Sequence, residues 1–274
     1  MLTVERWPPL RDPLLVASLT GWVDAGFAGA GAVEALGTQL EGSEQFATLD
    51  LTDLLDLQQT RPTARFADGG LRVIEWPRIA LVAGSLGRDV VLVHGPEPSI
   101  KWPAVAAEIV EAAQRLGVRE AVTLAGMPAL LSHRRPVPVL ATATSRTLAQ
   151  EVGGIRADYA GPTGMQTVLQ YAFGVGDIPC TGLWAQVPQY VSGSPSPPAV
   201  RAVLARLAEV YHLDIDLRVL DSRCDAYVAK VEEGLAQRPD VGDLVTRLET
   251  ETAAEMPSGD ELVSEIERFL RDET

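Results

Sequence analysis

Residues 20–36, TGWVDAGFAGAGAVEAL, follow an apolar run at residues 14–20 (LLVASLT) and begin a pattern of small and apolar residues that predicts a helix to about residue 40. A glycine-rich turn between a strand and a helix is typical of α/β domains, and helix N-termini of this kind can bind phosphate. The stretch therefore sets the fold class at the start of the chain and raises the question of whether its turn holds a phosphate.

Neither common phosphate-binding motif is complete in this stretch. A P-loop needs Lys and then Ser or Thr after its second glycine, and Phe27 and Ala28 stand at those positions. In the dinucleotide motif, Gly29 and Gly31 supply the first two glycines, but Glu34 takes the place of the third. A carboxylate there opposes both close packing and a bound anion. We therefore favour packing over phosphate binding for this turn.

The same residues suit a structural role. Asp24 is expected to cap a helix that begins near Ala25, because its carboxylate can accept hydrogen bonds from the unpaired N–H groups of the first turn. Glycine lowers helix propensity, so a helix with several glycines is expected to lie close to another element. The small residues that would let it approach a sheet are Gly26, Gly29, Ala30, Gly31 and Ala32.

Short β-branched runs alternate with helical patterns from residue 14 to about residue 184, which predicts an α/β core. After residues 14–20, strands are predicted at 46–51, 71–77, 78–84, 89–94, 118–125, 137–145 and 180–187. Proline cannot donate to a central ladder, so Pro77 is expected to separate a hairpin or two consecutive strands. Helices are predicted at about 102–116 and ending near residues 152 and 173.

The chain changes character after the last predicted strand. Residues 187–200 contain four prolines with serine and glycine, which predicts a surface loop. Four amphipathic patterns follow, at 200–211, 217–237, 241–252 and 259–270. Residues 221–274 hold fifteen acidic and six basic side chains, a net charge of −9. We therefore predict an α/β core domain at 1–213 and an acidic helical C-terminal segment at 214–274.

Charge and composition narrow the possible partners and surroundings. The net charge of −14 repels polyanions, so nucleic acid is not an expected partner. No apolar run approaches the roughly 18 residues of a membrane-spanning helix, and no secretory leader is evident. The two cysteines and three histidines show neither CxxC nor HExxH spacing. We expect a cytoplasmic protein without a metal site or a cofactor.

Six motifs occur in order along the chain, and together they resemble the family named for proteasome assembly chaperone 2, in its actinobacterial or archaeal form. They are GWVDAG (21–26), HGPEPSIKW (94–102), LAGMPALLSHRRPVPV (124–139), YAGPTGM (159–165), VPQYV (187–191) and PSGDELVSEIERFLR (257–271). Each motif is weak alone, but the six in this order span nearly the whole chain.

The resemblance implies a fold similar to that of purine nucleoside phosphorylases, in which helices flank a mixed central sheet. It also implies homo-oligomers, with a trimer as the expected form. Eukaryotic relatives are chaperones that assemble proteasome α-rings, whereas some bacterial members are labelled ATP-dependent carboxylate-amine ligases. The family has no established catalytic residues to transfer, and Gln189 stands where a histidine is expected before Tyr190.

Candidate ligand or partner residues lie in loops that follow predicted strands, where open α/β sheets bind their ligands. They are Trp22, Asp24, Glu97, Trp102, Arg134, Arg135, Thr163, Gly164 and Tyr190. The aromatic candidates can line the rim of a pocket, or they can anchor the core or a subunit interface.

The polar candidates also have structural alternatives. Glu97 can bind a ligand, hold a turn or pair with Lys101. The adjacent arginines at 134–135 can bind an anion, although pairing with the acidic C-terminal segment is favoured. Residues 163–164 can present N–H groups to an anion or only form a turn into a helix. His133 is expected to be a solvated loop histidine.

Two functions remain open from the sequence. The leading hypothesis is a homo-oligomeric protein that binds another protein, similar to an assembly chaperone, without chemistry of its own. The alternative is a small-molecule enzyme of the nucleoside phosphorylase or hydrolase type. ATP-dependent ligation is disfavoured, because the charged half of the P-loop is missing.

Overall fold

Parallel strands form the centre of the sheet and antiparallel strands complete its edges. In the computed structural model, which describes residues 1–67, 70–155 and 160–252, eight strands pair in the order β1-β3-β6-β7-β2-β8-β10-β9. Their bounds are β1 Leu2–Val4, β2 Leu14–Thr20, β3 Glu41–Asp50, β6 Arg78–Ser85, β7 Asp89–Pro96, β8 Glu120–Ala129, β9 Val139–Ala143 and β10 Cys180–Pro188. Strands β7, β2, β8 and β10 are mutually parallel. The predicted α/β class and the mixed central sheet are confirmed.

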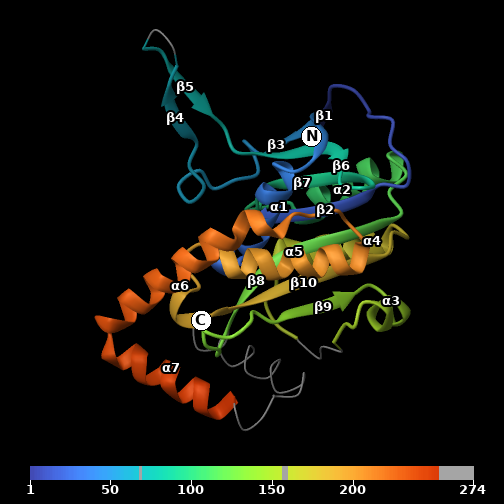
Figure 1. Cartoon of the computed structure of the whole chain (residues 1–274). Coiled ribbons are helices and arrows are strands. Elements are labelled where there is room, and N and C mark those ends of the chain that lie inside the picture. The colour runs from blue at the N-terminus through green and yellow to red at the C-terminus, as the bar shows by residue number, and fades with distance from the viewer. Residues whose placement is uncertain (68–69, 156–159, 253–274) are drawn as a thin grey trace.

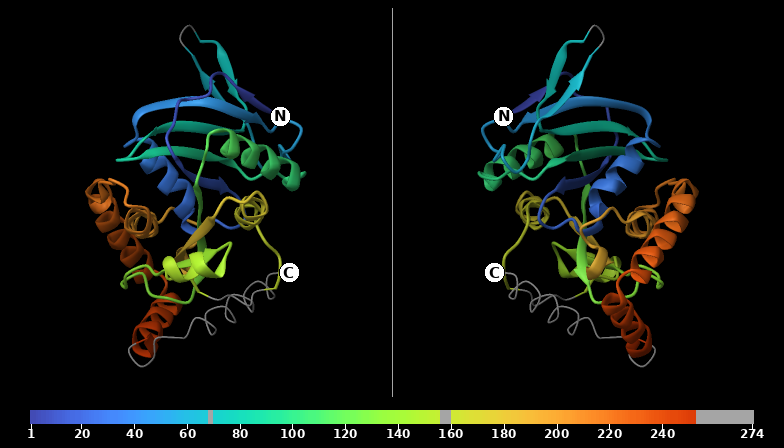
Figure 2. Two further views of the ribbon diagram at one scale, coloured as in Figure 1. Left: turned by 90° about the vertical axis from the view of Figure 1, so that its right-hand side faces the viewer. Right: turned by 90° about the vertical axis from the view of Figure 1, so that its left-hand side faces the viewer.

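Helices cover both faces of this sheet (Figures 1 and 2). Helices α1 (Ala28–Gly37) and α5 (Pro197–Tyr211) pack on one face, and α2 (Trp102–Arg115) and α4 (Met165–Val175) pack on the other. The short helix α3 (Arg146–Glu151) follows the edge strand β9. The described residues also form the 3-10 turns η1 (Ala25–Phe27), η2 (Gln189–Val191) and η3 (Leu217–Leu220). Each face of the sheet therefore contributes to its own hydrophobic cluster.

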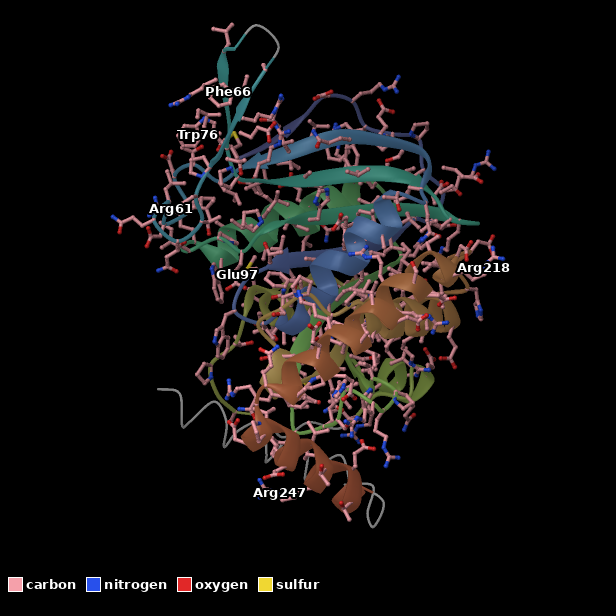
Figure 3. The ribbon with its side chains drawn as sticks, turned by 60° about the vertical axis from the view of Figure 1, so that its left-hand side comes forward. Arg61, Phe66, Trp76, Glu97, Arg218 and Arg247 are labelled. Carbon is pink, nitrogen blue, oxygen red and sulfur yellow. The ribbon has the colours of Figure 1, made fainter. Side chains whose placement is uncertain are left out.

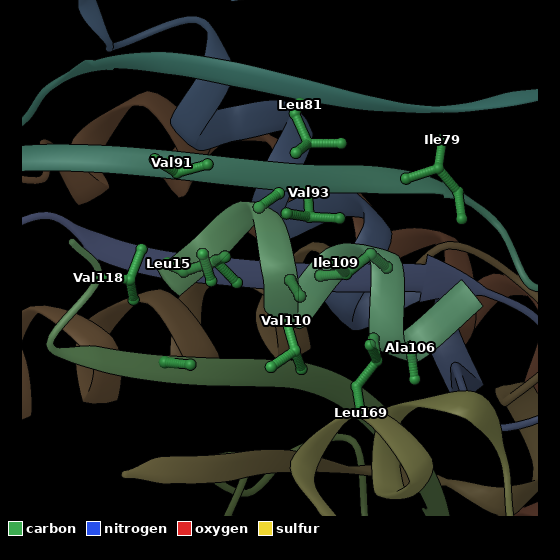
Figure 4. Close-up of a cluster of buried hydrophobic side chains, with 14 of the residues drawn as sticks. Leu15, Ile79, Leu81, Val91, Val93, Ala106, Ile109, Val110, Val118 and Leu169 are labelled. Carbon is green, nitrogen blue, oxygen red and sulfur yellow. The ribbon is translucent and has the colours of Figure 1, made fainter. Parts of the chain in front are cut away.

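The central strands are apolar on both faces because helices cover both. Strand β2 is buried over almost its whole length, and its alternate residues enter different clusters. Leu15 packs with Val93 and Ile109 on the side of α2 and α4, as Figure 4 shows. Leu14 and Val16 pack on the opposite side, with α1 and α5. The apolar run that opens the chain is therefore the middle of a three-layer core.

The backbone of helix α1 packs directly against the backbone of the sheet. A Cβ atom at Gly29 would overlap the Leu124 carbonyl oxygen and Ser18 Oγ, and one at Gly31 would lie 2.7 Å from Val200 Cγ2 of α5. The glycines of the quoted stretch thus let α1 fit between β8 and α5. This packing agrees with the structural role that the sequence favours.

A second, two-stranded sheet stands apart from the central one. Strand β4 (Thr63–Phe66) pairs with β5 (Arg72–Glu75), and the pair projects as a ribbon from the body (Figure 1). The predicted strands around Pro77 are consecutive, but β5 and β6 belong to different sheets. Strands β1 and β4 were not predicted, because both are too short to show alternation of apolar and polar residues.

The C-terminal segment is helical, as predicted. Helices α6 (Asp221–Ala236) and α7 (Pro239–Thr252) extend away from the sheet as an arm (Figures 1 and 2). The fourth predicted helix, at 259–270, lies outside the described residues. Among the described helices, none is long and apolar enough to cross a membrane.

Two glycines of α1 provide a test of this packing. We expect Gly29→Ala to lower the free energy of unfolding by about 1–3 kcal/mol, because the added methyl group overlaps backbone. Gly37→Ala is the matched control in the same helix. Its Cβ would meet only Leu92 Cδ1 at 3.9 Å, so a gain of about 0.5–1 kcal/mol is expected from the lower conformational entropy of the unfolded chain. Urea denaturation measures both changes, and equal effects would contradict the packing.

Candidate functional site

The candidate residues lie along the carboxyl edge of the parallel strands, but they belong to separate groups. Trp22 and Asp24 follow β2, Glu97 and Trp102 follow β7, the two arginines follow β8, and Tyr190 follows β10. Thr163 and Gly164 precede α4 at the same edge. The hydrogen bonds divide these residues into two helix caps and one network that joins the sheet to the C-terminal arm.

Asp24 caps α1, but the helix begins later in the chain than predicted. The helix begins at Ala28, after the turn η1, instead of near Ala25. The two carboxylate oxygens accept hydrogen bonds from the N–H groups of Gly29 (2.7 Å) and Ala30 (3.1 Å). Burial raises the pKa of Asp24 to about 6, and hydrogen bonds from backbone N–H groups oppose the rise. The N–H groups that could bind a phosphate here are bonded to this carboxylate.

Glu97 caps α4 in the same manner. Its Oε2 accepts a hydrogen bond from the Met165 N–H at 3.2 Å, and a Cβ at Gly21 would lie 2.5 Å from that oxygen. Glu97 is labelled in Figure 3. Burial raises the pKa of its carboxyl. The carboxylate therefore bonds the first N–H group of α4, directly after Thr163 and Gly164.

The two tryptophan candidates differ in exposure. The indole N–H of Trp102 donates to the Pro98 carbonyl, and the half-buried ring packs against the hydrophobic cluster of α2 and α4. Trp22 is 56% exposed in the loop after β2. Of these two tryptophans, only Trp22 therefore presents a large apolar area to a partner.

His133 is the centre of a hydrogen-bond network that was not predicted from the sequence. The expectation of a solvated side chain is wrong, because the imidazole is fully buried. Its Nδ1 lies 2.7 Å from Tyr190 Oη, which also accepts the His133 backbone N–H at 2.9 Å. Its Nε2 lies 3.0 Å from Glu232 Oε1 on α6.

These contacts assign the proton positions on a neutral imidazole. Glu232 can only accept, so Nε2 carries the proton, and Nδ1 accepts from the Tyr190 hydroxyl. Burial lowers the pKa of His133, although Glu232 opposes the shift, and burial raises that of Tyr190 to about 12. Both polar groups are thus held in their neutral forms, with their hydrogen-bonding capacity used inside the protein.

The adjacent arginines join the loop after β8 to the C-terminal arm. Arg134 makes a bidentate pair with Glu232, with Nε–Oε1 and Nη2–Oε2 distances of 2.6 and 2.9 Å. Arg135 contacts Glu249 on α7 through Nε–Oε1 at 3.3 Å. The hydrogen bond from Arg134 is the main cause that lowers the pKa of Glu232 to about 2. Of the two roles considered for these arginines, the structure shows pairing with the acidic segment.

The polar groups at this edge have partners within the chain. The carboxylates of Asp24, Glu97 and Glu232 and the imidazole of His133 are hydrogen-bonded within the chain. Burial raises the pKa of both cysteine thiols, and that of Cys180 is raised far above its usual range. No cluster of three potential metal ligands is found in the described ranges.

The same edge carries exposed apolar side chains that no sequence motif groups together. Trp22 and Phe27 follow β2, Ile100 follows β7 and Leu130 follows β8, with exposed fractions of 56%, 46%, 51% and 41%. Strands β7, β2 and β8 are neighbours, so their loops meet at one edge. The signal in the sequence is a large apolar residue in the loop after each of three parallel strands, which becomes visible only once the strand order is known.

Comparison with known proteins gives one family. The PAC2 family model matches residues 18–235. A PAC2 family protein from Streptomyces avermitilis is 38% identical, with 85% of this chain and 100% of that one covered and a TM-score of 0.79. A proteasome-assembly chaperone homologue from Mycobacterium tuberculosis is 33% identical over 85% of this chain and 99% of that one, with a TM-score of 0.76. No curated protein matched.

A more distant structure shares the fold. PbaB, an archaeal proteasome activator from Pyrococcus furiosus, is 20% identical over 85% of this chain and 97% of that one, with a TM-score of 0.70. Since the identity is low, this likeness concerns the architecture alone.

The Asp24 cap should give a measurable dependence of stability on pH. In the unfolded chain the carboxyl ionises near pH 4, and in the folded chain near pH 6. Between these values the folded state binds the additional proton, so the contribution of Asp24 to the free energy of unfolding falls as the pH rises, by about 3 kcal/mol at most. Asp24→Asn removes this titration. The free energy of unfolding that the variant lacks relative to the wild type should therefore shrink from pH 4 to pH 7. A difference in urea denaturation that stays constant over this range would contradict the buried cap.

The contact between the C-terminal arm and the loop after β8 should weaken when the Glu232 carboxylate is removed. Glu232→Ala leaves the buried Nε2–H of His133 without an acceptor and breaks the bidentate pair, so we expect a loss of about 1–3 kcal/mol. Hydrogen exchange in α6 should accelerate. Glu233→Ala, at the exposed neighbouring position, is the control. If both variants exchange alike, the network does not hold the arm.

Proposed function

This chain belongs to the PAC2 family, and we propose that it is a cytoplasmic, homo-oligomeric protein that binds proteasome subunits and assists their assembly. The family relation supports a chaperone-like role, since a relative that is 33% identical is named a proteasome-assembly chaperone homologue. The proposal assigns the binding of the partner to the surface of the protein and no reaction to its loops.

The apolar carboxyl edge is the observation that carries this proposal. Trp22, Phe27, Ile100 and Leu130 are 41–56% exposed on the loops of three neighbouring strands. Several large apolar side chains exposed at one edge favour an interaction surface there, and aromatic residues are enriched among those that dominate binding energy. A groove or cap on a proteasome subunit that buries these side chains is the occupant we propose.

The backbone of Phe27 strengthens the argument. This residue adopts φ 50° and ψ 38°, in the left-handed region, although its side chain is 46% exposed. A bulky residue in this conformation costs about 1–2 kcal/mol, which glycine would avoid. Folding alone does not require an exposed aromatic group there, and strained backbone is frequent at binding sites. A partner that contacts the ring would explain the choice of residue.

The enzymatic alternative draws on the same loops but needs unoccupied polar groups. Asp24 and Glu97 bind helix N-termini, and Arg134 binds Glu232. We therefore do not propose the phosphorylase or hydrolase type, nor a ligase. We keep the division into an α/β core domain at 1–213 and an acidic helical C-terminal segment at 214–274 as part of the proposal, with the trimer as the expected oligomer.

Two substitutions test the binding surface. Trp22→Ala and Phe27→Gly should each weaken capture of purified proteasome α-subunits by about tenfold or more, since each removes an aromatic contact. Phe27→Gly should also be at least as stable to urea as the wild type, because glycine relieves the left-handed backbone.

Tyr171→Ala is the matched control, because Tyr171 is an aromatic residue of α4 with 72% exposure. Its capture of α-subunits should equal that of the wild type. Wild-type protein that binds no α-subunit, or edge variants that bind as well as Tyr171→Ala, would refute the proposal.

A further inference from the structure

The turn that carries Phe27 is held by a second loop. Gly26 and Phe27 are consecutive residues in the left-handed region, with φ angles of 65° and 50°. A bulky residue such as Phe27 rarely adopts this conformation, so surrounding contacts have to hold it. Two hydrogen bonds to residues 189–196, the segment between β10 and α5, supply such contacts.

Both backbone polar groups of Gly26 are bonded to this segment. The Gly26 N–H donates to the Ser192 carbonyl at 2.7 Å, and the Gly26 carbonyl accepts from the Ser196 N–H at 2.8 Å. The fit is tight, because a Cβ atom at Gly26 would lie 2.8 Å from Ser196 Cβ and 3.1 Å from Val187 Cγ2. A displacement of residues 192–196 therefore moves the backbone directly before Phe27.

Tyr190 attaches the same segment to the loop after β8. It lies in η2, and the Ser192 N–H and hydroxyl both donate to the Gln189 carbonyl, at 3.3 and 2.9 Å. The Tyr190 hydroxyl accepts from the backbone N–H of the fully buried His133 and lies 2.7 Å from its Nδ1. Loss of bonds to buried polar groups is costly. The hydroxyl therefore fixes the 189–196 segment against that loop.

One imidazole connects Tyr190 to the C-terminal arm. Glu232 accepts from His133 Nε2, and this bond keeps the ring proton on Nε2. The opposite nitrogen, Nδ1, is then free to accept from the Tyr190 hydroxyl. Without Glu232, a proton on Nδ1 would compete with that hydroxyl. The bond on α6 thus selects the tautomer that Tyr190 requires.

The contacts of α6 with the body are of a kind that opens locally. Val231 is the only buried residue of α6, and Arg134, which pairs with Glu232, is 45% exposed. Exposed ion pairs contribute little to stability, and elements with few buried apolar residues open before the core unfolds. The bond between Glu232 and His133 can therefore break while the sheet stays intact.

We propose that the C-terminal arm controls the aromatic surface of the carboxyl edge. When Glu232 is bonded to His133, Tyr190 keeps residues 189–196 against Gly26, and the left-handed turn holds the Phe27 ring outward. When α6 detaches, the segment is released and the strained turn relaxes. Tyr190 is thus a positioning residue. This regulation rests on the proposed function, in which Phe27 contacts the partner.

NMR spectra of the free, full-length protein test the coupling. We expect the Gly26 amide resonance to move in Tyr190→Phe and, in the same direction, in Glu232→Ala, because both variants release the 189–196 segment. Glu233→Ala is the control, since Glu233 is the exposed neighbour of Glu232. A general loss of stability leaves the resonances of the folded state in place. A merely structural role of Glu232 would therefore not move this signal.

A conservative variant separates hydrogen bonding from charge. Glu232→Gln keeps an oxygen that accepts from His133 Nε2 but loses the ion pair with Arg134, so the Gly26 resonance should stay near its wild-type position. Nitrogen NMR of the His133 ring should show the proton on Nε2 in the wild type and in Glu232→Gln, and a mixture of tautomers in Glu232→Ala. The double variant Tyr190→Phe/Glu232→Ala should move the Gly26 resonance no further than Tyr190→Phe does, because Glu232 acts through Tyr190.

Capture of purified proteasome α-subunits measures the consequence for the edge. Tyr190→Phe and Glu232→Ala should each raise the dissociation constant by about three- to tenfold, the factor that corresponds to one lost hydrogen bond. The double variant should bind no more weakly than Tyr190→Phe, and Glu233→Ala should bind like the wild type.

Three results would overturn the inference. They are a Gly26 resonance that moves no more in Glu232→Ala than in Glu233→Ala, effects of the two single variants that add in the double variant, or, where the wild type binds α-subunits, undiminished capture by Glu232→Ala. The spectra of the free protein need no partner, so they decide the coupling independently of the proposed function. If the Gly26 resonance responds as expected but the wild type captures no α-subunit, only the partner assignment fails.

Discussion

The approach of α1 to the sheet is the constraint on which the rest of the structure depends. The helix lies so close to β8 that a side chain at Gly29 would overlap the backbone of Leu124. The turn before the helix places the Asp24 carboxylate at the N-terminus of α1, where it accepts hydrogen bonds from the Gly29 and Ala30 N–H groups. The next layer, α5, can then pack on Gly31. One close contact thus fixes the spacing of three layers.

This constraint also determines how the polar groups at the carboxyl edge are used. In many α/β proteins, helix N-termini at this edge are left open for phosphate or other anions. Here the carboxylates of Asp24 and Glu97 bind two of them, Asp24 is buried and Glu97 is half-buried, and burial raises the pKa of both. Covering these N-termini internally stabilises the fold and leaves apolar side chains, such as Trp22 and Phe27, as the exposed features of the edge. Such a surface is suited to a protein partner.

Periodicity in the sequence predicted the elements that are long and buried. Residues 14–20 and 89–94 are continuous apolar runs because helices cover both of their faces, and each is a strand. The ribbon strand β4 was missed, since it consists of four exposed residues and has no buried face to impose a pattern. The site was predicted unevenly for the same reason. Asp24 was recognised as a cap from local rules, whereas the burial of His133 depends on Glu232, which lies far along the chain.

The sequence by itself determined the α/β class, the small residues that α1 needs, the acidic helical arm and the absence of a complete phosphate-binding motif, because each depends on local spacing and composition. Only the tertiary structure decided which carboxylates cap which helices, that Arg134 is paired, and that exposed apolar residues from three loops share one edge. These features join residues that are far apart in the chain. Strand order and helix packing set the distances between these residues, and no local sequence pattern determines either of them.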